Sequence, residues 1–288
     1  MLEAAAPARD LPGRGSGLSP GDVRLTTWVV RLHRRRPAAP LRIVVIMNET
    51  AELRNAITGL LALTAAEEEL LLATTRRAPD GPGSADCWSA LPVIAHNTVF
   101  KRQQVRRLAA IEAGQDPPEF TEIDHRSPEV YRELAGLPAG QVARESRETT
   151  AALIDGLGGL SDEDLLDPAR HPWLRGRQLG LQIIVRGFWH PQGHLGEYYA
   201  AHGRPDRAVT LAEYAAAGAG YLTAPPAARG MAYYNLACAQ ARASLIAGAV
   251  SSLEVAVRLN PDLRLNARRD ADLDGLRGDA GFSALLAE

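Results

Sequence analysis

Three histidines have the type and the spacing to hold a metal ion. His190 and His194 lie four residues apart, so on a helix both imidazoles lie on one face, at a separation that a single ion can bridge. His96 is the natural third ligand, because it interrupts an otherwise apolar helical face that should point into the core. Ligands from facing helices are a recurrent way to build a metal site in a helical bundle.

Each histidine also has a simpler interpretation. A single histidine on an apolar face is more often a hydrogen-bonded core residue, and two histidines four residues apart often occur by chance. Pro191 removes one backbone hydrogen bond within the pair and can kink the helix, although Gly187 and Gly193 could absorb the kink. Together, the three histidines favour a metal site more strongly than any one of them does.

Glu197 has two candidate roles beside the histidines. It follows His194 by three residues, so it lies on the same helical face, where it could orient the imidazole or act as a general base. A solvated helix carboxylate is an equally good interpretation. Asn97 directly follows His96 and should face away from it, so it is a weaker candidate.

Other groups with chemical potential have structural explanations. His125 and His171 lie in predicted loops, where histidines are usually solvated. Cys87 and Cys238 are the only cysteines and lie far apart, which excludes a disulfide scaffold and a CxxC site. Ser161 begins a sequence typical of a capping box, and this explains a nearby acidic cluster without a cation. The cluster comprises Asp162, Glu163, Asp164 and Asp167.

Composition excludes several classes of function. The chain has 32 basic and 34 acidic side chains and a formal net charge of −2, so it lacks the dense basic surface that nucleic-acid binding requires. Lys101 is the only lysine, so a lysine-based mechanism such as Schiff-base chemistry would depend on that residue alone. Neither a glycine-rich phosphate loop nor a nucleophile-elbow motif occurs.

Helical periodicity places the three histidines on long helices. Apolar residues recur at helical spacing over residues 49–75, 88–114, 139–157 and 176–202, and glycine- and proline-containing loops separate these segments. No segment shows the alternation of a half-buried strand. The sequence therefore predicts an all-α fold with a four-helix bundle over residues 47–203.

Residues 1–46 differ from the rest of the chain. They contain eight arginines against three acidic residues and show little periodicity, which predicts a disordered leader. Alternatively, translation starts at Met47, where the helical pattern begins. The longest apolar run of the chain is residues 43–47, too short for a signal peptide or a membrane span. We therefore expect a cytoplasmic protein.

Residues 204–288 predict a small second helical domain. The order of large and small residues here matches the pattern of a 34-residue tetratricopeptide-like repeat that ends at Pro261. The matching positions are Tyr233, Leu236, Ala237, Ala249, Leu253 and Ala256. One repeat cannot bury its own apolar face, so it should pack on the bundle or on another subunit, which makes a homodimer one arrangement to consider.

Residues 47–203 resemble the DinB-like (YfiT-like) four-helix bundle proteins. Residues 88–96 are similar to the tryptophan-led motif of that family, which ends in histidine, and residues 189–198 are similar to its HxxxH motif. The positions that match the metal ligands of the family are His96, His190 and His194. Asn97 departs from the pattern, because a small apolar residue usually follows the first histidine.

The resemblance implies a divalent metal ion, such as zinc, nickel, iron or copper, held by three neutral imidazoles. Characterised relatives include thiol-dependent S-transferases and isomerases and proteins that detoxify electrophiles. We therefore expect a metal-dependent transferase or hydrolase that activates water or a low-molecular-weight thiol toward a small electrophile. The alternative is a non-catalytic interaction module that binds a protein partner through residues 204–288.

Overall fold

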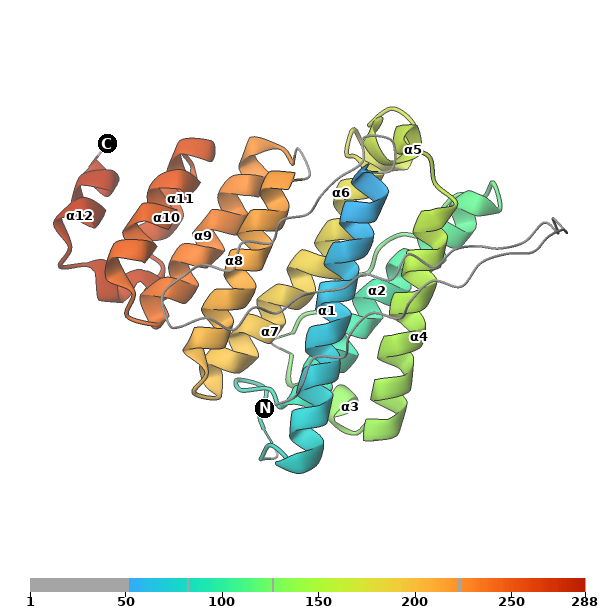
Figure 1. Cartoon of the computed structure of the whole chain (residues 1–288), viewed down its shortest axis with the longest axis horizontal. Helices are drawn as coiled ribbons and strands as arrows, with labels where there is room; N and C mark the ends of the chain where they lie inside the picture. The colour runs from blue at the N-terminus through green and yellow to red at the C-terminus, as the bar shows by residue number, and fades with distance from the viewer. Residues whose placement is uncertain (1–51, 82, 126, 222–223, 288) are drawn as a thin grey trace, which may run out of the picture. The chain divides into compact units, whose positions relative to one another are not determined.

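The computed structural model describes residues 52–81, 83–125, 127–221 and 224–287 (Figure 1). All the secondary-structure elements in these ranges are helices, and the one β-bridge, between Ser84 and Cys87, is isolated. The all-α prediction is therefore confirmed. All the described residues belong to one compact unit. The predicted leader, 1–46, and the alternative start at Met47 lie outside the described residues.

The bundle is built from long helices that pack side by side. Helix α1 packs against α2 and α4, and α2 packs against α4 and α7. These helices are α1 (Glu52–Arg77), α2 (Ala90–Glu112), α4 (Ala139–Gly158) and a last one in three parts, α6 (Leu179–Ile184), η2 (Val185–Trp189) and α7 (His190–Ala201). Each overlaps a helix that the periodicity predicts, and the ends differ by a few residues.

Short helices and caps fill the connections. Ser127 accepts a hydrogen bond from the backbone of Val130 at the start of α3 (Pro128–Ala135). Ser161 and Asp164 form the predicted capping box of α5 (Asp162–Leu166), in which each side chain accepts from the other residue's backbone N–H. Hydrogen bonds from Ser161 and Arg170 lower the pKa of Asp164 to about 2. The acidic cluster therefore has a structural role here.

The last bundle helix changes its pitch just before the histidine pair. Residues 185–189 form a π-helical turn, and Pro191 is the second residue of the α-helix that follows. Proline lacks the N–H of an ordinary helical hydrogen bond, and its ring clashes with a carbonyl one turn earlier, so a wider turn relieves both problems. Gly187 lies in this turn, and a β-carbon there would meet the side chains of Leu61 and Leu153.

A buried polar network crosses the bundle core. Lys101 is fully buried, and its Nζ donates to Glu68 Oε2 at 2.7 Å and to Thr150 Oγ1 at 3.0 Å. Glu68 also accepts from Ser146 at 2.6 Å and from Asn97 at 3.3 Å. The only lysine of the chain is therefore an interior ion-pair partner, and Asn97 points into this network.

Further helices follow the bundle. Helix α8 packs against both α7 and α9, and α9 packs against α10 and η3. Trp189 Nε1 donates to the carbonyl of Ala215 at 3.2 Å, and Arg207 pairs with Glu67, so side chains join α8 to the bundle. The helices are α8 (Pro205–Tyr221), α9 (Pro226–Arg242), α10 (Ile246–Leu259), α11 (Leu263–Ala267), η3 (Ala271–Leu276) and α12 (Ala280–Ala287).

The domain division at residues 203 and 204 stays a prediction. Gly203, with a φ of 72°, makes the turn between α7 and α8 at that point. Within the described ranges, no helix combines the length and the apolar character needed to cross a bilayer.

Candidate metal centre

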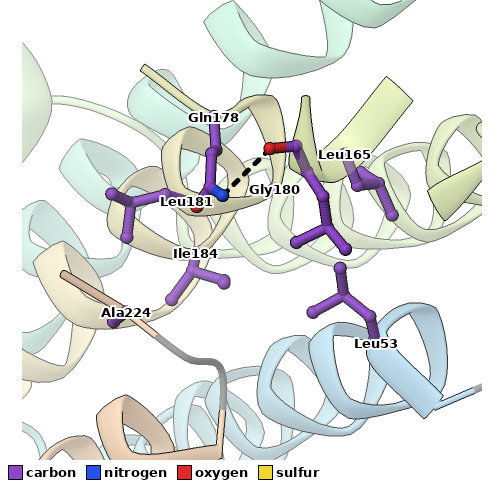
Figure 2. Close-up of a pocket in the computed structure, with 8 residues that line it drawn as sticks. Leu53, Leu165, Gln178, Gly180, Leu181, Ile184 and Ala224 are labelled. Carbon is purple, nitrogen blue, oxygen red and sulfur yellow. Dashed lines mark hydrogen bonds between the residues drawn. The ribbon is translucent and has the colours of Figure 1, made fainter. Parts of the chain in front are cut away.

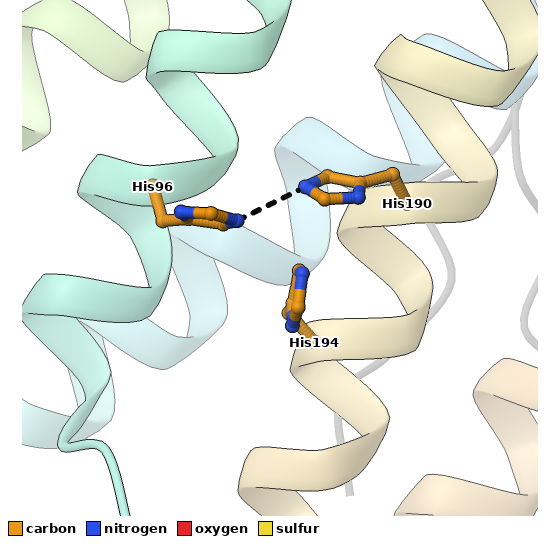
Figure 3. Close-up of side chains that lie close together, drawn as sticks. All are labelled: His96, His190 and His194. Atoms are coloured by element: carbon orange, nitrogen blue, oxygen red, sulfur yellow. Dashed lines mark hydrogen bonds between the residues drawn. The ribbon is translucent and has the colours of Figure 1, made fainter. Parts of the chain in front are cut away.

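The three predicted ligands lie together between two helices. His96 projects from α2, and His190 and His194 project from successive turns of α7 (Figure 3). The Nε2 atoms of His96 and His190 are 3.1 Å apart, and one ligand atom from each of the three rings lies within 4.8 Å of the others. His96 is buried, and the other two are partly buried. The fold therefore brings residue 96 to a pair almost a hundred positions later.

The distances fit a single ion. Two imidazole nitrogens that bind one ion at about 2.1 Å lie roughly 2.9–3.4 Å apart in octahedral or tetrahedral geometry. The separation of 3.1 Å between His96 and His190 falls in this range. One ring nitrogen of His194 is directed toward the space between the other two rings (Figure 3). Three nitrogen donors and no carboxylate in this group suit zinc, nickel, iron or copper.

The electrostatic surroundings keep the buried rings neutral. Burial, and then the charges of His194 and His125, lower the pKa of His96 to about 3. Burial, and then the charges of His194 and His96, lower the pKa of His190 to about 2. Both rings are therefore uncharged at pH 7, which is the form of histidine that binds a metal.

Aromatic side chains hold two of the rings in place. Phe100, one turn after His96 on α2, stacks on His190 with ring centroids 3.9 Å apart. Trp88 approaches His96 edge-on at 5.5 Å. These contacts exclude water from one side of the site and limit rotation of the imidazoles. The buried Nδ1 of His96 has no hydrogen-bond partner among the described residues.

Glu197 contacts His194. Its Oε2 lies 3.0 Å from His194 Nδ1, and its side chain is 58% exposed. Partial burial raises the pKa of Glu197, but the hydrogen bond and the charge of His194 outweigh this effect and lower it overall. An ionised Glu197 accepts a hydrogen bond from Nδ1–H of His194, and the tautomer protonated at Nδ1 leaves Nε2 available to a metal. The geometry thus favours the orienting role over a purely solvated carboxylate.

His125 is a residue that sequence reasoning missed. It lies in the loop between α2 and α3, yet it is half-buried, and its ring centroid is 4.8 Å from that of His194 and 6.4 Å from that of His96. Its ligand atom also lies within 4.8 Å of His194 and Glu197. The expectation of a solvated loop histidine is wrong here, because the loop folds back over the histidines. No local pattern at residue 125 signals this return.

Other candidates lie outside the site. His171 is buried, and its Nε2 is 3.0 Å from the carbonyl of Asp164, so it is a structural residue rather than a solvated one. Cys87 is exposed and Cys238 is buried. A small cavity near the start of α1 has mostly apolar walls that include Leu53, and the amide of Gln178 there donates to the carbonyl of Leu166 at 2.9 Å (Figure 2). This cavity offers no reactive group.

A family model matches the part of the chain that contains the candidate site. The family model described as the DinB superfamily matches residues 52–198. This span is about half of the chain; it includes all three histidines and Glu197 and ends before α8. No curated protein and no solved structure matches the chain.

Proposed function

The chain belongs to the DinB superfamily, and from this premise we propose that it is a metal-dependent enzyme that activates water or a low-molecular-weight thiol. The reaction is thiol transfer to a small electrophile, or its hydrolysis. The observation that carries the proposal is the convergence of His96, His190 and His194 on one point between α2 and α7. Three imidazoles provide half or more of the usual ligand positions and leave the others for water or substrate.

The residues of the site have distinct roles in this proposal. His96, His190 and His194 would hold a divalent ion, which would lower the pKa of a bound water or thiol and so supply hydroxide or thiolate near neutral pH. Glu197 accepts a hydrogen bond from Nδ1–H of His194 and so favours the tautomer protonated at that nitrogen. Phe100 packs on His190 and keeps water from its inner face. His125 lies beside His194, where it can donate to or accept from a bound substrate.

The test is whether the protein has an activity that depends on both the metal and its histidine ligands. Zinc- or nickel-loaded protein is mixed with a low-molecular-weight thiol and chlorodinitrobenzene, and separately with an activated ester, and product formation is followed by absorbance. We expect turnover by the wild type that falls to background after chelation and in His194→Ala. Turnover that survives both changes, or no turnover in either assay, would contradict the proposal.

Glu197→Ala is expected to weaken metal binding by about 10–100-fold, the usual effect of removing a group that orients a histidine ligand. Glu197→Gln keeps an acceptor oxygen and should have a smaller effect. Metal affinity is measured by competition with a chromophoric chelator. Glu213→Ala, an exposed carboxylate on α8, serves as the control and should match the wild type. If Glu197 is instead a general base, turnover falls while metal affinity is unchanged.

We also propose that α9 and α10 form a tetratricopeptide-like pair. The match of the family model ends at residue 198 and does not reach these helices. The small residues predicted for the helix crossing, Ala237, Ala249 and Ala256, are fully buried. Ala249→Leu should therefore lower the free energy of unfolding by about 1–3 kcal/mol through overpacking, whereas exposed Ala247→Leu should have little effect. Equal stability of the two variants in thermal unfolding would contradict this packing.

A further inference from the structure

Two arginines lie beside the histidine site on aromatic side chains. The guanidinium carbon of Arg107, on α2, is 4.3 Å from the ring centroid of Trp173 and 5.8 Å from that of Phe120. The guanidinium carbon of Arg186, in the π-helical turn, is 3.9 Å from the Phe120 centroid and 5.6 Å from that of Phe100. One aromatic side chain, Phe120, thus contacts both cations.

The charge of this pair is only partly compensated. Arg186 donates to both carboxylate oxygens of Glu122, the shorter contact being 2.7 Å. No carboxylate in the described part of the chain pairs with Arg107, and burial and the nearby charge of Arg186 lower the pKa of Arg107. The Nε atoms of both arginines are buried without a hydrogen-bond acceptor. Two like charges with unused donors in a half-buried place favour the binding of an anion.

The arginine pair borders the metal centre. The ring of Phe100 stacks on His190. The guanidinium group of Arg186 also lies near this ring. The charge of Arg186 is also one of the causes that lower the pKa of His190. Arg186 and His190 therefore lie close together, with Phe100 as a common neighbour.

The loop that carries Phe120 and Glu122 is attached to α2. The side-chain amide of Gln103 donates to the carbonyl of Thr121 at 2.9 Å and accepts from its backbone N–H at 2.7 Å. This pair of hydrogen bonds fixes the residues on either side of Thr121 over the arginines. Glu122 itself is 71% exposed, so its ion pair with Arg186 is a weak surface interaction that a ligand can displace.

We propose that Arg107 and Arg186 form a binding site for the carboxylate group of the substrate or of its thiol cosubstrate. The aromatic rings cover faces of the guanidinium groups and leave the N–H edges, whose planar fork matches a carboxylate. Glu122 occupies one of these edges until the ligand arrives. That the bound molecule is a reactant rests on the proposed function. The binding of an anion at the two arginines requires no metal.

The test is calorimetric titration of succinate into chelator-treated full-length protein at constant ionic strength, with uncharged succinamide as the control ligand. We expect succinate to bind and succinamide not to bind. Arg107→Gln should weaken succinate binding by about tenfold or more, the loss expected for a charge-assisted bidentate contact. Arg106→Gln, an exposed neighbour on α2, should bind as the wild type does.

A second variant separates loss of the site from loss of the fold. Glu122→Gln removes the internal carboxylate that competes for Arg186 and should tighten succinate binding by about threefold or more, which misfolding cannot mimic. The proposal is overturned if Arg107→Gln binds succinate normally, if Glu122→Gln weakens binding, or if the wild type binds only inorganic phosphate. Because these titrations use protein from which a chelator has removed the metal, their outcomes do not depend on whether the histidines support catalysis.

Discussion

Protein with both His190→Ala and His194→Ala should retain no metal, whereas the wild type should purify with about one equivalent per chain, the stoichiometry of a single three-histidine site. The two residues supply two of the three donor nitrogens, and His96 alone offers one. A single imidazole cannot compete with water and buffer for a divalent ion at micromolar concentration. Elemental analysis of the protein as purified, and again after zinc or nickel addition and gel filtration, checks the result.

Thermal unfolding gives an independent measurement of the same site. A ligand that binds only the folded state stabilises it by about 2.7 kcal/mol at a free concentration 100 times its dissociation constant. Added zinc or nickel should therefore raise the Tm of the wild type and leave that of the double variant unchanged. His202→Ala, at the end of the same helix, is the matched control and should bind metal normally. Metal retained at one equivalent by the folded double variant would refute the site.

Lys101→Met should lower the free energy of unfolding by about 3–5 kcal/mol, the range for breaking one side of a buried ion pair. Lys101 and Glu68 have side chains that are 0% and 1% exposed, so the carboxylate left behind would be buried without its cation. Ser146 and Asn97 would still donate to Glu68, but neither carries a compensating charge. Urea unfolding followed by circular dichroism measures the loss.

Two further variants show that the effect comes from the unpaired charge. The double change Lys101→Met, Glu68→Leu removes both charges, and it should be more stable than Lys101→Met alone. Arg147→Met breaks the exposed pair between α4 and Glu69 of α1, and it should change stability by about 1 kcal/mol or less. A Lys101→Met protein as stable as Arg147→Met would contradict a structural role for the buried pair.

Local patterns in the sequence determine much of this protein. Apolar residues at helical spacing locate the bundle helices, because a helix that packs on a core must place its apolar side chains on one face. The capping box at Ser161 follows from hydrogen bonds within four residues. The joint orientation of His190 and His194 follows from the pitch of one helix, and the π-helical turn before Pro191 shifts this helix without separating the pair.

Tertiary structure alone decided which distant groups meet. The contacts between His96 and His190 and between Lys101 and Glu68 join residues 94 and 33 positions apart. His96 could be proposed from its apolar face, but nothing near Glu68 or His125 in the sequence identifies their partners. The same holds for Arg107 and Arg186, which meet on Phe120 because the loop after α2 returns across the bundle. Periodicity reports which face of a helix is buried, whereas the partner across the interface depends on how the helices pack.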